Sequence, residues 1–314
     1  MAQITPPEIS HPRSRVGYLG PEGTFSEEAV LSASTPEAVE PVPLQTIYDT
    51  VTALRRRQVD WAVVPIENSL DGSISVTLDL LAGEASDVEI VGETLLRVRH
   101  SLIAAEPLAL KEIEQVLTHP QVPGQCTRFL RHELPHARIL PASSTAEAVR
   151  IVAGEHAEAG RRRGRAALGT VLAARIYGGT VLREGVQDRA DNETRFVWLA
   201  RAQPGADRSQ ISPPPLRDGG AGDWKTSLVF WGPGAERPGW LVRCLDEFAR
   251  RDINLTKIES RPRRERLGSY MFFADLTGRP GQAPVDAAIE GLRVLCEQVR
   301  VLGSYQRARQ AAAG

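Results

Sequence analysis

The chain has 314 residues, of which 42% are hydrophobic and 25% charged, and its formal net charge is −1. This composition is typical of a globular protein of about two domains, and the near-zero charge argues against nucleic acid or an anionic membrane as a partner. No stretch reaches the roughly 18 apolar residues of a membrane helix, and residues 1–14 lack the apolar core of a secretory signal. Three well-separated cysteines without metal-ligand spacing predict a cytoplasmic enzyme with reduced thiols and no metal.

Residues 1–14 are polar and proline-rich and are expected to form a flexible lead. Residues 15–201 then alternate short apolar runs with longer amphipathic segments. The predicted strands cover residues 16–19, 61–65, 97–103, 115–117 and 166–168, and the predicted helices cover 25–31, 47–57, 108–115, 122–133, 144–152 and 171–176. Strands that alternate with helices predict an α/β fold with a parallel, doubly wound sheet, here as two similar lobes with a cleft between them.

Residues 202–223 contain three consecutive prolines and several glycines, so we expect a linker there rather than a helix or a central strand. Residues 224–306 follow with a second pattern of strands and helices. Its predicted elements cover residues 226–231, 240–250, 255–259, 270–276, 285–299 and 301–302. This βαββαβ order is the ferredoxin-like arrangement. Residues 307–314 are predicted to be a flexible C-terminus.

Two polar segments follow predicted strands of the first lobe. In residues 20–26, Thr24 and Ser26 can cap a helix whose dipole and exposed amide groups favour an anion, although a plain strand-to-helix turn explains the same residues. Glu67, Asn68 and Ser69 follow the strand over 61–65, where open α/β sheets bind ligands. An Asx turn followed by a helix cap would also use them.

Three more segments place polar side chains beside predicted strands and helices. Thr118 ends a short strand, and Gln125 lies on the helix that follows it. Ser144 and Thr145 fit a capping box, and capping alone would account for both. The run from 192 to 196, Asn-Glu-Thr-Arg-Phe, enters a strand and either faces a cleft or forms an ordinary strand with an exposed arginine.

In their order and spacing, these segments resemble prephenate dehydratase. The matching runs are Gly-Pro-x-Gly-Thr-Phe-Ser, Glu-Asn-Ser, Thr-His-Pro-Gln with its Gln-Cys, Ser-Thr-Ala-Glu-Ala and Asn-x-Thr-Arg-Phe. The resemblance covers residues 15–201. The C-terminal region is similar to the ACT regulatory domain that is attached to these enzymes, most clearly in Glu-Ser-Arg-Pro at 259–262.

The resemblance implies two lobes like those of periplasmic binding proteins, with an active site between them that converts prephenate to phenylpyruvate without a cofactor. It implies that Thr194 hydrogen-bonds the leaving hydroxyl group, because a threonine hydroxyl is too weak an acid to donate its proton unaided. The predicted catalytic set is completed by polar residues that orient the substrate: Asn68, Thr118 and Gln125. The predicted substrate-binding residues are Thr24, Ser26, Ser69, Ser144 and Thr145, with Glu67 and Arg195 as supporting residues.

ACT domains pair side by side and bind an amino acid, so the resemblance implies a homodimer or homotetramer that L-phenylalanine inhibits. The predicted effector-binding residues are Gly239, Trp240, Leu241, Glu259, Ser260, Arg261 and Pro262. Trp240 replaces the alanine that is usual in the family, so its indole either narrows the effector pocket or points outward. Three alternatives remain: a domain that only drives dimerisation, an enzyme that prefers arogenate, and a non-catalytic amino-acid sensor.

Overall fold

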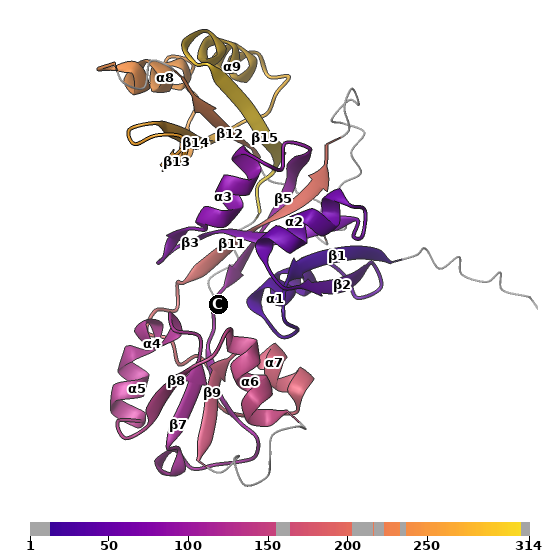
Figure 1. Cartoon of the computed structure of the whole chain (residues 1–314), viewed down its shortest axis with the longest axis vertical. Coiled ribbons are helices and arrows are strands. Elements are labelled where there is room, and N and C mark those ends of the chain that lie inside the picture. The colour runs from indigo at the N-terminus through magenta and orange to yellow at the C-terminus, as the bar shows by residue number, and fades with distance from the viewer. Residues whose placement is uncertain (1–12, 155–163, 203–215, 217–222, 233–236, 309–314) are drawn as a thin grey trace, which may run out of the picture.

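The computed structural model describes residues 13–154, 164–202, 216, 223–232 and 237–308. Most of the predicted lead (1–14) and linker (202–223), and the last six residues of the predicted C-terminus (307–314), lie outside the described residues. The described residues form three layers along the long axis of the molecule, as Figure 1 shows. Within the described ranges, no helix is long and apolar enough to cross a membrane.

The first lobe is built on a mixed sheet in which β1 pairs in parallel with both β2 and β3. Two long strands, β5 and β11, pair with each other in antiparallel fashion, and β11 also pairs with β3. The elements are β1 (Ser14–Leu19), α1 (Phe25–Ala33), β2 (Val39–Leu44), α2 (Ile47–Arg55), β3 (Trp61–Asn68), β4 (Gly72–Ser73), α3 (Ser75–Ala82), β5 (Val88–Arg97) and β11 (Glu193–Arg201).

The second lobe is inserted between β5 and β11, so the chain passes between the lobes twice. Its five-stranded sheet has the order β10-β6-β9-β7-β8, with β8, β7 and β9 parallel. The elements are β6 (Ser101–Ala104), the 3-10 helix η1 (Leu110–Glu112), β7 (Gln115–Thr118), α4 (Val122–Gln125), α5 (Thr127–Glu133), β8 (Arg138–Pro141), α6 (Thr145–Ala153), β9 (Arg165–Gly169), α7 (Val171–Tyr177) and β10 (Thr180–Arg183).

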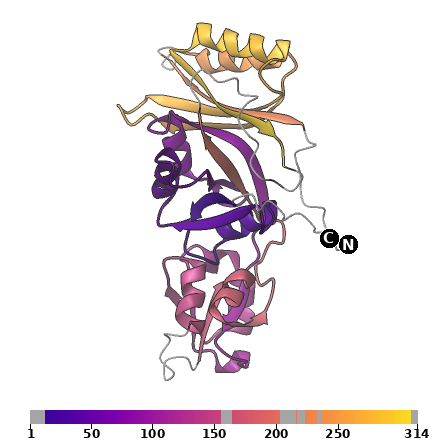
Figure 2. The ribbon, with the colours of Figure 1, turned by 90° about the vertical axis from the view of Figure 1, so that its right-hand side faces the viewer.

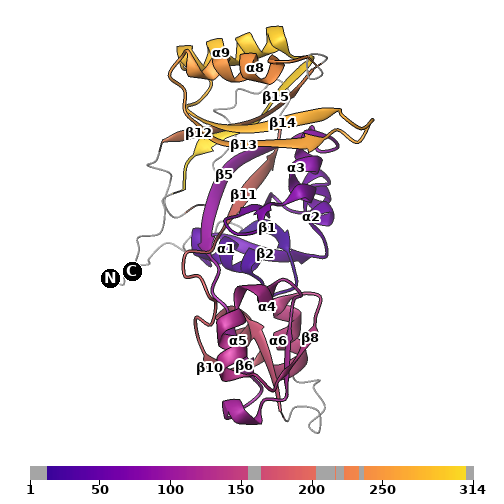
Figure 3. The same cartoon turned by 90° about the vertical axis from the view of Figure 1, so that its left-hand side faces the viewer.

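The C-terminal domain has the predicted βαββαβ order, with strands arranged β13-β14-β12-β15. Helices α8 and α9 cover one face of this sheet, and the other face packs on the first lobe, as Figures 2 and 3 show. Both faces of this sheet are apolar because side chains alternate along its strands. Phe273 and Tyr305 belong to the first lobe's core, whereas Phe272 and Leu276 pack under the helices. The elements are β12 (Trp224–Trp231), α8 (Trp240–Ala249), β13 (Leu255–Pro262), β14 (Tyr270–Thr277), α9 (Ala283–Leu295) and β15 (Gln298–Gln306).

One backbone contact makes the sheets of the first lobe and the C-terminal domain continuous. Strand β15 pairs in parallel with β5 at Gly303 and Ile90. A Cβ atom on Gly303 would lie 2.0 Å from the Ile90 carbonyl oxygen, so only glycine permits this approach. The result is a ten-stranded sheet that runs through both domains.

Several predicted elements differ from those observed. The single strand predicted over 97–103 is two strands, β5 and β6, because residues 98–100 carry the chain from the first lobe to the second. The helix predicted over 108–115 is only the 3-10 turn η1, and the helix predicted over 122–133 is interrupted at Cys126. The last strand extends well beyond the predicted residues 301–302, because it pairs with both β12 and β5.

Candidate active site

The carboxyl ends of the parallel strands from both lobes face each other. In the first lobe β1 leads into α1, and β3 ends at Asn68. In the second lobe β7, β8 and β9 lead into α4, α6 and α7. Figure 1 shows the α1 end of the first lobe opposite the α4, α6 and α7 end of the second. Open α/β sheets bind ligands beyond the carboxyl ends of their strands, and helix N-termini favour anions, so this junction is the candidate active site.

Asn68 and Thr194 form a hydrogen-bonded pair at the centre of the junction. The antiparallel register of β3 and β11 places them opposite each other although they are 126 residues apart. Asn68 Nδ2 donates to Thr194 Oγ1 at 2.9 Å, and Asn68 Oδ1 accepts from the amide groups of Leu70 and Asp71. The Thr194 oxygen is therefore an acceptor for Asn68, and its own proton is available for another group.

Gln125 connects this pair to the second lobe. Its Oε1 atom lies 3.0 Å from His100 Nε2 and accepts from Asn192 Nδ2 at 3.2 Å, and its Nε2 atom donates to Asp71 at 3.1 Å. Asn192 in turn accepts from Asn68 at 2.9 Å. The predicted residues Asn68, Gln125 and Thr194 thus belong to one network that spans both lobes.

His100 and Asn192 are members of this network that the sequence analysis did not predict. His100 is 1% exposed, and burial lowers the pKa of its ring, which is therefore neutral near pH 7. Because Gln125 Oε1 only accepts, His100 carries its proton on Nε2, and its buried Nδ1 atom has no hydrogen-bond partner among the residues that the structure describes. His100 follows the end of β5 and belongs to no motif, whereas Asn192 is the first residue of the Asn-x-Thr-Arg-Phe motif.

The turn before α1 docks on the second lobe. Gly23 has a φ of +82°, and a Cβ atom there would lie 2.7 Å from Ala173 Cα, so the turn requires glycine. Thr170 at the start of α7 donates to the Gly23 carbonyl oxygen at 2.6 Å. Phe25 meets His100 edge to face, with ring centroids 5.4 Å apart. Thr170 was not predicted; like the predicted caps, it is a hydroxyl residue directly before a helix.

Two of the predicted hydroxyl residues around the junction serve as helix caps. Thr24 accepts from the Glu27 amide and donates to the Leu19 carbonyl, and Ser144 accepts from the Glu147 amide. These two caps place the amide ends of α1 and α6 at the junction. The remaining predicted hydroxyl residues there are also close to the helix starts or strand ends: Ser26 and Thr145 are buried, and Ser69 bonds the backbone of residue 193.

Thr118 is fully buried at the end of β7, and its hydroxyl donates to the Leu168 carbonyl oxygen at 3.1 Å. The hydroxyl proton is therefore used within the second lobe. Its position at a strand end beside α4 agrees with the predicted location, but the contact it makes is internal.

Glu67 and Arg195 do not face the junction. Side chains alternate along a strand, so the neighbours of Asn68 and Thr194 point to the opposite face of the sheet. The guanidinium group of Arg195 bonds Glu93, Asp275 and Tyr305, and Glu67 lies 3.2 Å from the amine of Lys257. Both side chains lie between the first lobe and the C-terminal domain, so their place among the substrate-binding residues needs correction, whereas a supporting role from behind the site stays a prediction.

Trp240, at the start of α8, points into the core of the C-terminal domain. The side chain is 3% exposed, its ring packs against Phe230 and Phe272, and its Nε1 atom donates to the Leu295 carbonyl oxygen at 2.9 Å. The alternative that the indole points outward is therefore wrong. Gly239, with a φ of +78°, directly precedes the helix, and Leu241 is half-buried.

The predicted effector run at 259–262 is divided between the two faces of β13. Glu259 hydrogen-bonds Ser73, and Arg261 binds Asp79 through Nε at 2.7 Å, so both side chains face the first lobe. Ser260 and Pro262 are exposed, so only these two residues of the run remain open to a ligand on the helix-bearing face of the domain.

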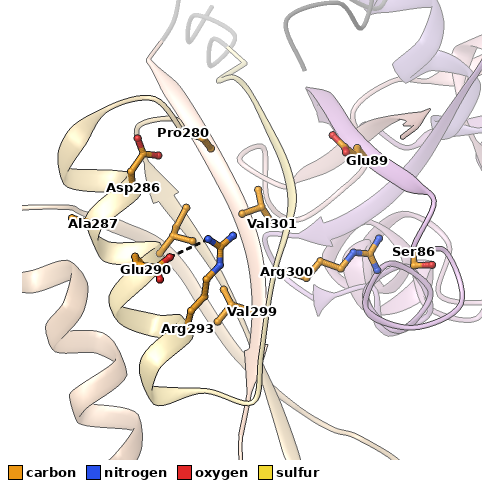
Figure 4. Close-up of a pocket in the computed structure, with 11 residues that line it drawn as sticks. Ser86, Glu89, Pro280, Asp286, Ala287, Glu290, Arg293, Val299, Arg300 and Val301 are labelled. Carbon is orange, nitrogen blue, oxygen red and sulfur yellow. Dashed lines mark hydrogen bonds and ion pairs between the residues drawn. The ribbon is translucent and has the colours of Figure 1, made fainter. Parts of the chain in front are cut away.

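A separate pocket of about 730 Å³ lies between the C-terminal domain and the start of β5 (Figure 4). Its polar lining includes Ser86, Glu89, Asp286, Glu290, Arg293 and Arg300. None of the predicted site residues lines it. The described residues also contain no group of three or more His, Cys, Asp and Glu side chains placed to hold a metal ion.

The comparisons with known proteins agree with this architecture. The family model described as prephenate dehydratase matches residues 16–204. A prephenate dehydratase of Mycobacterium sp. (strain JLS) is 39% identical over 301 residues, which cover 93% of this chain and 88% of the relative.

Two solved structures are similar over nearly the whole chain. The prephenate dehydratase of Arthrobacter aurescens in complex with L-Phe has a TM-score of 0.80 and 32% identity, over 95% of this chain and 92% of that one. GqqA, described as a novel type of quorum quenching acylase, has a TM-score of 0.78 and 27% identity, over 94% and 98% of the two chains. From the matched family model and the curated relative, this chain belongs to the prephenate dehydratase family.

Proposed function

We propose that the chain decarboxylates and dehydrates prephenate to phenylpyruvate at the junction of its two lobes, within residues 15–201. One observation supports placing the active site there: a hydrogen-bonded network joins both lobes at the ends of their strands. Its members are Asn68, Thr194, Asn192, Gln125 and His100. Polar side chains in a fixed network suit a reaction whose main demand is that a dianion be held and a leaving group assisted.

The reaction needs no electron acceptor. The bond between the ring and its carboxylate breaks, carbon dioxide leaves, and the bonding electrons enter the ring. The C4–O bond breaks at the other side of the ring, and the departing hydroxide takes a proton to become water. Aromatisation drives these changes, so the protein acts mainly by positioning and by stabilising the departing oxygen.

Thr194 is suited to the departing oxygen. Its hydroxyl oxygen already accepts from Asn68, which orients the hydroxyl proton toward a further acceptor. In this proposal that acceptor is the C4 oxygen, on which negative charge develops as the C4–O bond breaks. Thr194 then relays a proton to the departing oxygen: its hydroxyl gives up one proton and receives another from a further donor. Asn68 and Gln125 orient Thr194 and the substrate.

The two carboxylates of prephenate are proposed to lie at the amide ends of α1 and α6. The caps Thr24 and Ser144 already hold these helix ends in place, and the positive ends of both helix dipoles favour anions. Ser26, Ser69 and Thr145 are proposed to complete the surrounding surface, and the fully buried Thr118 is proposed to support it from within the second lobe. Glu67 and Arg195 are left out because they face the C-terminal domain.

The C-terminal domain, residues 224–306, is proposed to be an ACT domain that binds L-phenylalanine and lowers turnover. Its βαββαβ order and the L-Phe bound in the Arthrobacter aurescens structure support this. Gly239, Leu241, Ser260 and Pro262 are the predicted effector residues still available on its outer side, whereas Trp240 shapes the pocket from within.

A homodimer or homotetramer is proposed from the similarity to ACT domains, which pair side by side, and the C-terminal domain exposes apolar side chains at Val242, Ile258 and Val294. The cysteines of the described residues are unpaired thiols, which supports a cytoplasmic location. Cys244 and Cys296, distant in sequence, have sulfur atoms 3.8 Å apart.

The test is phenylpyruvate formation from purified prephenate, with and without L-phenylalanine. Separate reactions measure phenylalanine formation from arogenate and hydrolysis of an acyl amide. Turnover of prephenate that phenylalanine suppresses is the expected result. A preference for arogenate would reassign the substrate, and hydrolysis of the acyl amide alone would reassign the activity. A folded protein that turns over none of them would favour the amino-acid sensor.

A further inference from the structure

The strand that carries Thr194 also reaches the C-terminal domain one residue later. Thr194 and Arg195 are consecutive in β11, so their side chains lie on opposite faces of the sheet. Thr194 faces the lobe junction and bonds Asn68, whereas the guanidinium group of Arg195 reaches Asp275 in β14 and Tyr305 in β15. One short stretch of β11 therefore touches both the candidate active site and the C-terminal sheet.

Arg195 is the centre of a buried ionic cluster. Its Nε atom lies 2.7 Å from Glu93, its Nη1 atom 2.6 Å from Asp275, and its Nη2 atom donates to the Tyr305 hydroxyl at 2.6 Å. The amine of Lys225 lies 2.8 Å from Glu93. We call these five residues the Arg195 cluster.

The Arg195 cluster is closed to solvent and crosses the domain interface. Its five residues are each less than 9% exposed. Glu93 and Arg195 come from the first lobe, whereas Lys225, Asp275 and Tyr305 come from the C-terminal domain. Two ion pairs of the cluster cross the interface, Arg195–Asp275 and Lys225–Glu93, and both have short hydrogen bonds. Because the surroundings have a low dielectric constant, stretching or breaking these pairs is unfavourable.

A second group of contacts reaches the strand of Asn68. Glu67 precedes Asn68 in β3, points away from it, and lies 3.2 Å from Lys257 in β13 and 3.4 Å from Arg195. Lys257 also donates to Ser73 at 2.6 Å, and Glu259 of the same strand contacts Ser73. Both members of the Asn68–Thr194 pair thus have a chain neighbour that is held by the C-terminal sheet.

We propose that Arg195 and Glu67 are positioning residues for the Thr194–Asn68 pair, and that effector binding to the C-terminal domain reaches the cleft through the Arg195 cluster. This inference rests on the proposed function and adds to it the physical route of regulation. A movement of β13 and β14 displaces Asp275 and Lys257, the charged partners of these two residues. Because β3 and β11 are paired with each other, such a displacement alters the geometry in which Thr194 meets its substrate.

The test uses full-length Asp275→Asn, which keeps the shape of the side chain and removes its charge. Arg195 retains Glu93 and Tyr305 as partners. We expect kcat without effector to fall more than threefold, because Asp275 holds the positioning residue Arg195, and the phenylalanine concentration that halves the remaining turnover to rise at least about tenfold. Calorimetry should show that phenylalanine binds the variant with nearly unchanged Kd, a separation that a purely structural role would not produce.

Tyr305→Phe provides a milder second variant, because it removes only the hydroxyl that Arg195 and Ser227 contact. Glu290→Gln is the matched control, since it removes a charge from an exposed ion pair with Arg293 in the same domain. The control should respond to phenylalanine like the wild type, and Tyr305→Phe should be less inhibited than the wild type even if Asp275→Asn does not fold.

Three outcomes would overturn the inference while leaving the dehydratase activity intact. The first is that phenylalanine inhibits Asp275→Asn as it inhibits the wild type or, if that variant does not fold, inhibits Tyr305→Phe in this way. The second is that the variant loses phenylalanine binding together with inhibition. The third is that the wild type turns over prephenate without responding to phenylalanine. Absence of prephenate turnover in the wild type would instead refute the proposed function, and this inference with it.

Discussion

Replacing Thr194 by valine tests the proposed chemistry most directly. The two side chains have almost the same shape, but valine lacks the hydroxyl that accepts from Asn68 and is proposed to donate to the leaving oxygen. In the substrate-free protein, the loss is a single hydrogen bond of 2.9 Å. Asn68 keeps Asn192 as an acceptor at 2.9 Å and the backbone carbonyl of residue 193 at 3.3 Å.

The two consequences of this substitution differ in size. Because Asn68 retains other acceptors, the loss of stability should be about 1 kcal/mol, the low end for a buried group that loses a partner. This corresponds to a fall in Tm of about 2–4 °C for a unit of this size. Turnover should suffer far more, since removal of one donor that stabilises developing negative charge lowers kcat by about 10²–10³.

The assay compares kcat, KM and thermal unfolding for the wild type, Thr194→Val and Thr194→Ser, the last of which restores the hydroxyl. Thr50→Val is the matched control, because Thr50 is a fully buried threonine of α2 whose hydroxyl bonds the Thr46 carbonyl away from the junction. We expect kcat to fall only in Thr194→Val, with KM little changed. A folded Thr194→Val with kcat within threefold of the wild type would refute the role assigned to Thr194.

Three further predictions follow from individual contacts. Gln125→Leu removes the amide that joins His100, Asn192 and Asp71. KM for prephenate should rise about tenfold, which corresponds to the loss of one hydrogen bond between uncharged groups, roughly 1.4 kcal/mol. An unchanged KM in steady-state kinetics would contradict this. Trp240→Ala leaves a cavity in the C-terminal core and should reduce the free energy of unfolding by about 3–5 kcal/mol in urea titrations, and a loss below about 1 kcal/mol would show that the indole is not a core residue. Burial raises the pKa of Glu28 to about 7, so the folded state binds the extra proton between pH 4.5 and 7 and loses stability as the pH rises through that range. Glu28→Gln should therefore raise the Tm at pH 8 and leave it unchanged at pH 4, and an equal shift at both values would disprove the pH dependence.

Much of the local structure could be predicted from the sequence because it depends on near neighbours. Thr24 and Ser144 were expected to cap helices, and each accepts the amide three residues further on, as the short-range geometry of a helix start requires. The βαββαβ order of the C-terminal domain was also predicted, since period-2 and period-3.6 patterns are visible within single segments. The five motifs identified the family for a related reason: their residue types occur in a fixed order along the chain.

Only the tertiary structure decided which of these residues meet and which face each one uses. The register of β3 and β11 brings Asn68 to Thr194, and the same register turns Glu67 and Arg195 toward the C-terminal domain. A one-residue change of register would exchange those faces, and no pattern within either segment specifies the pairing. His100 shows the same limit, because its place in the network depends on how the second lobe closes on the first rather than on its sequence neighbours.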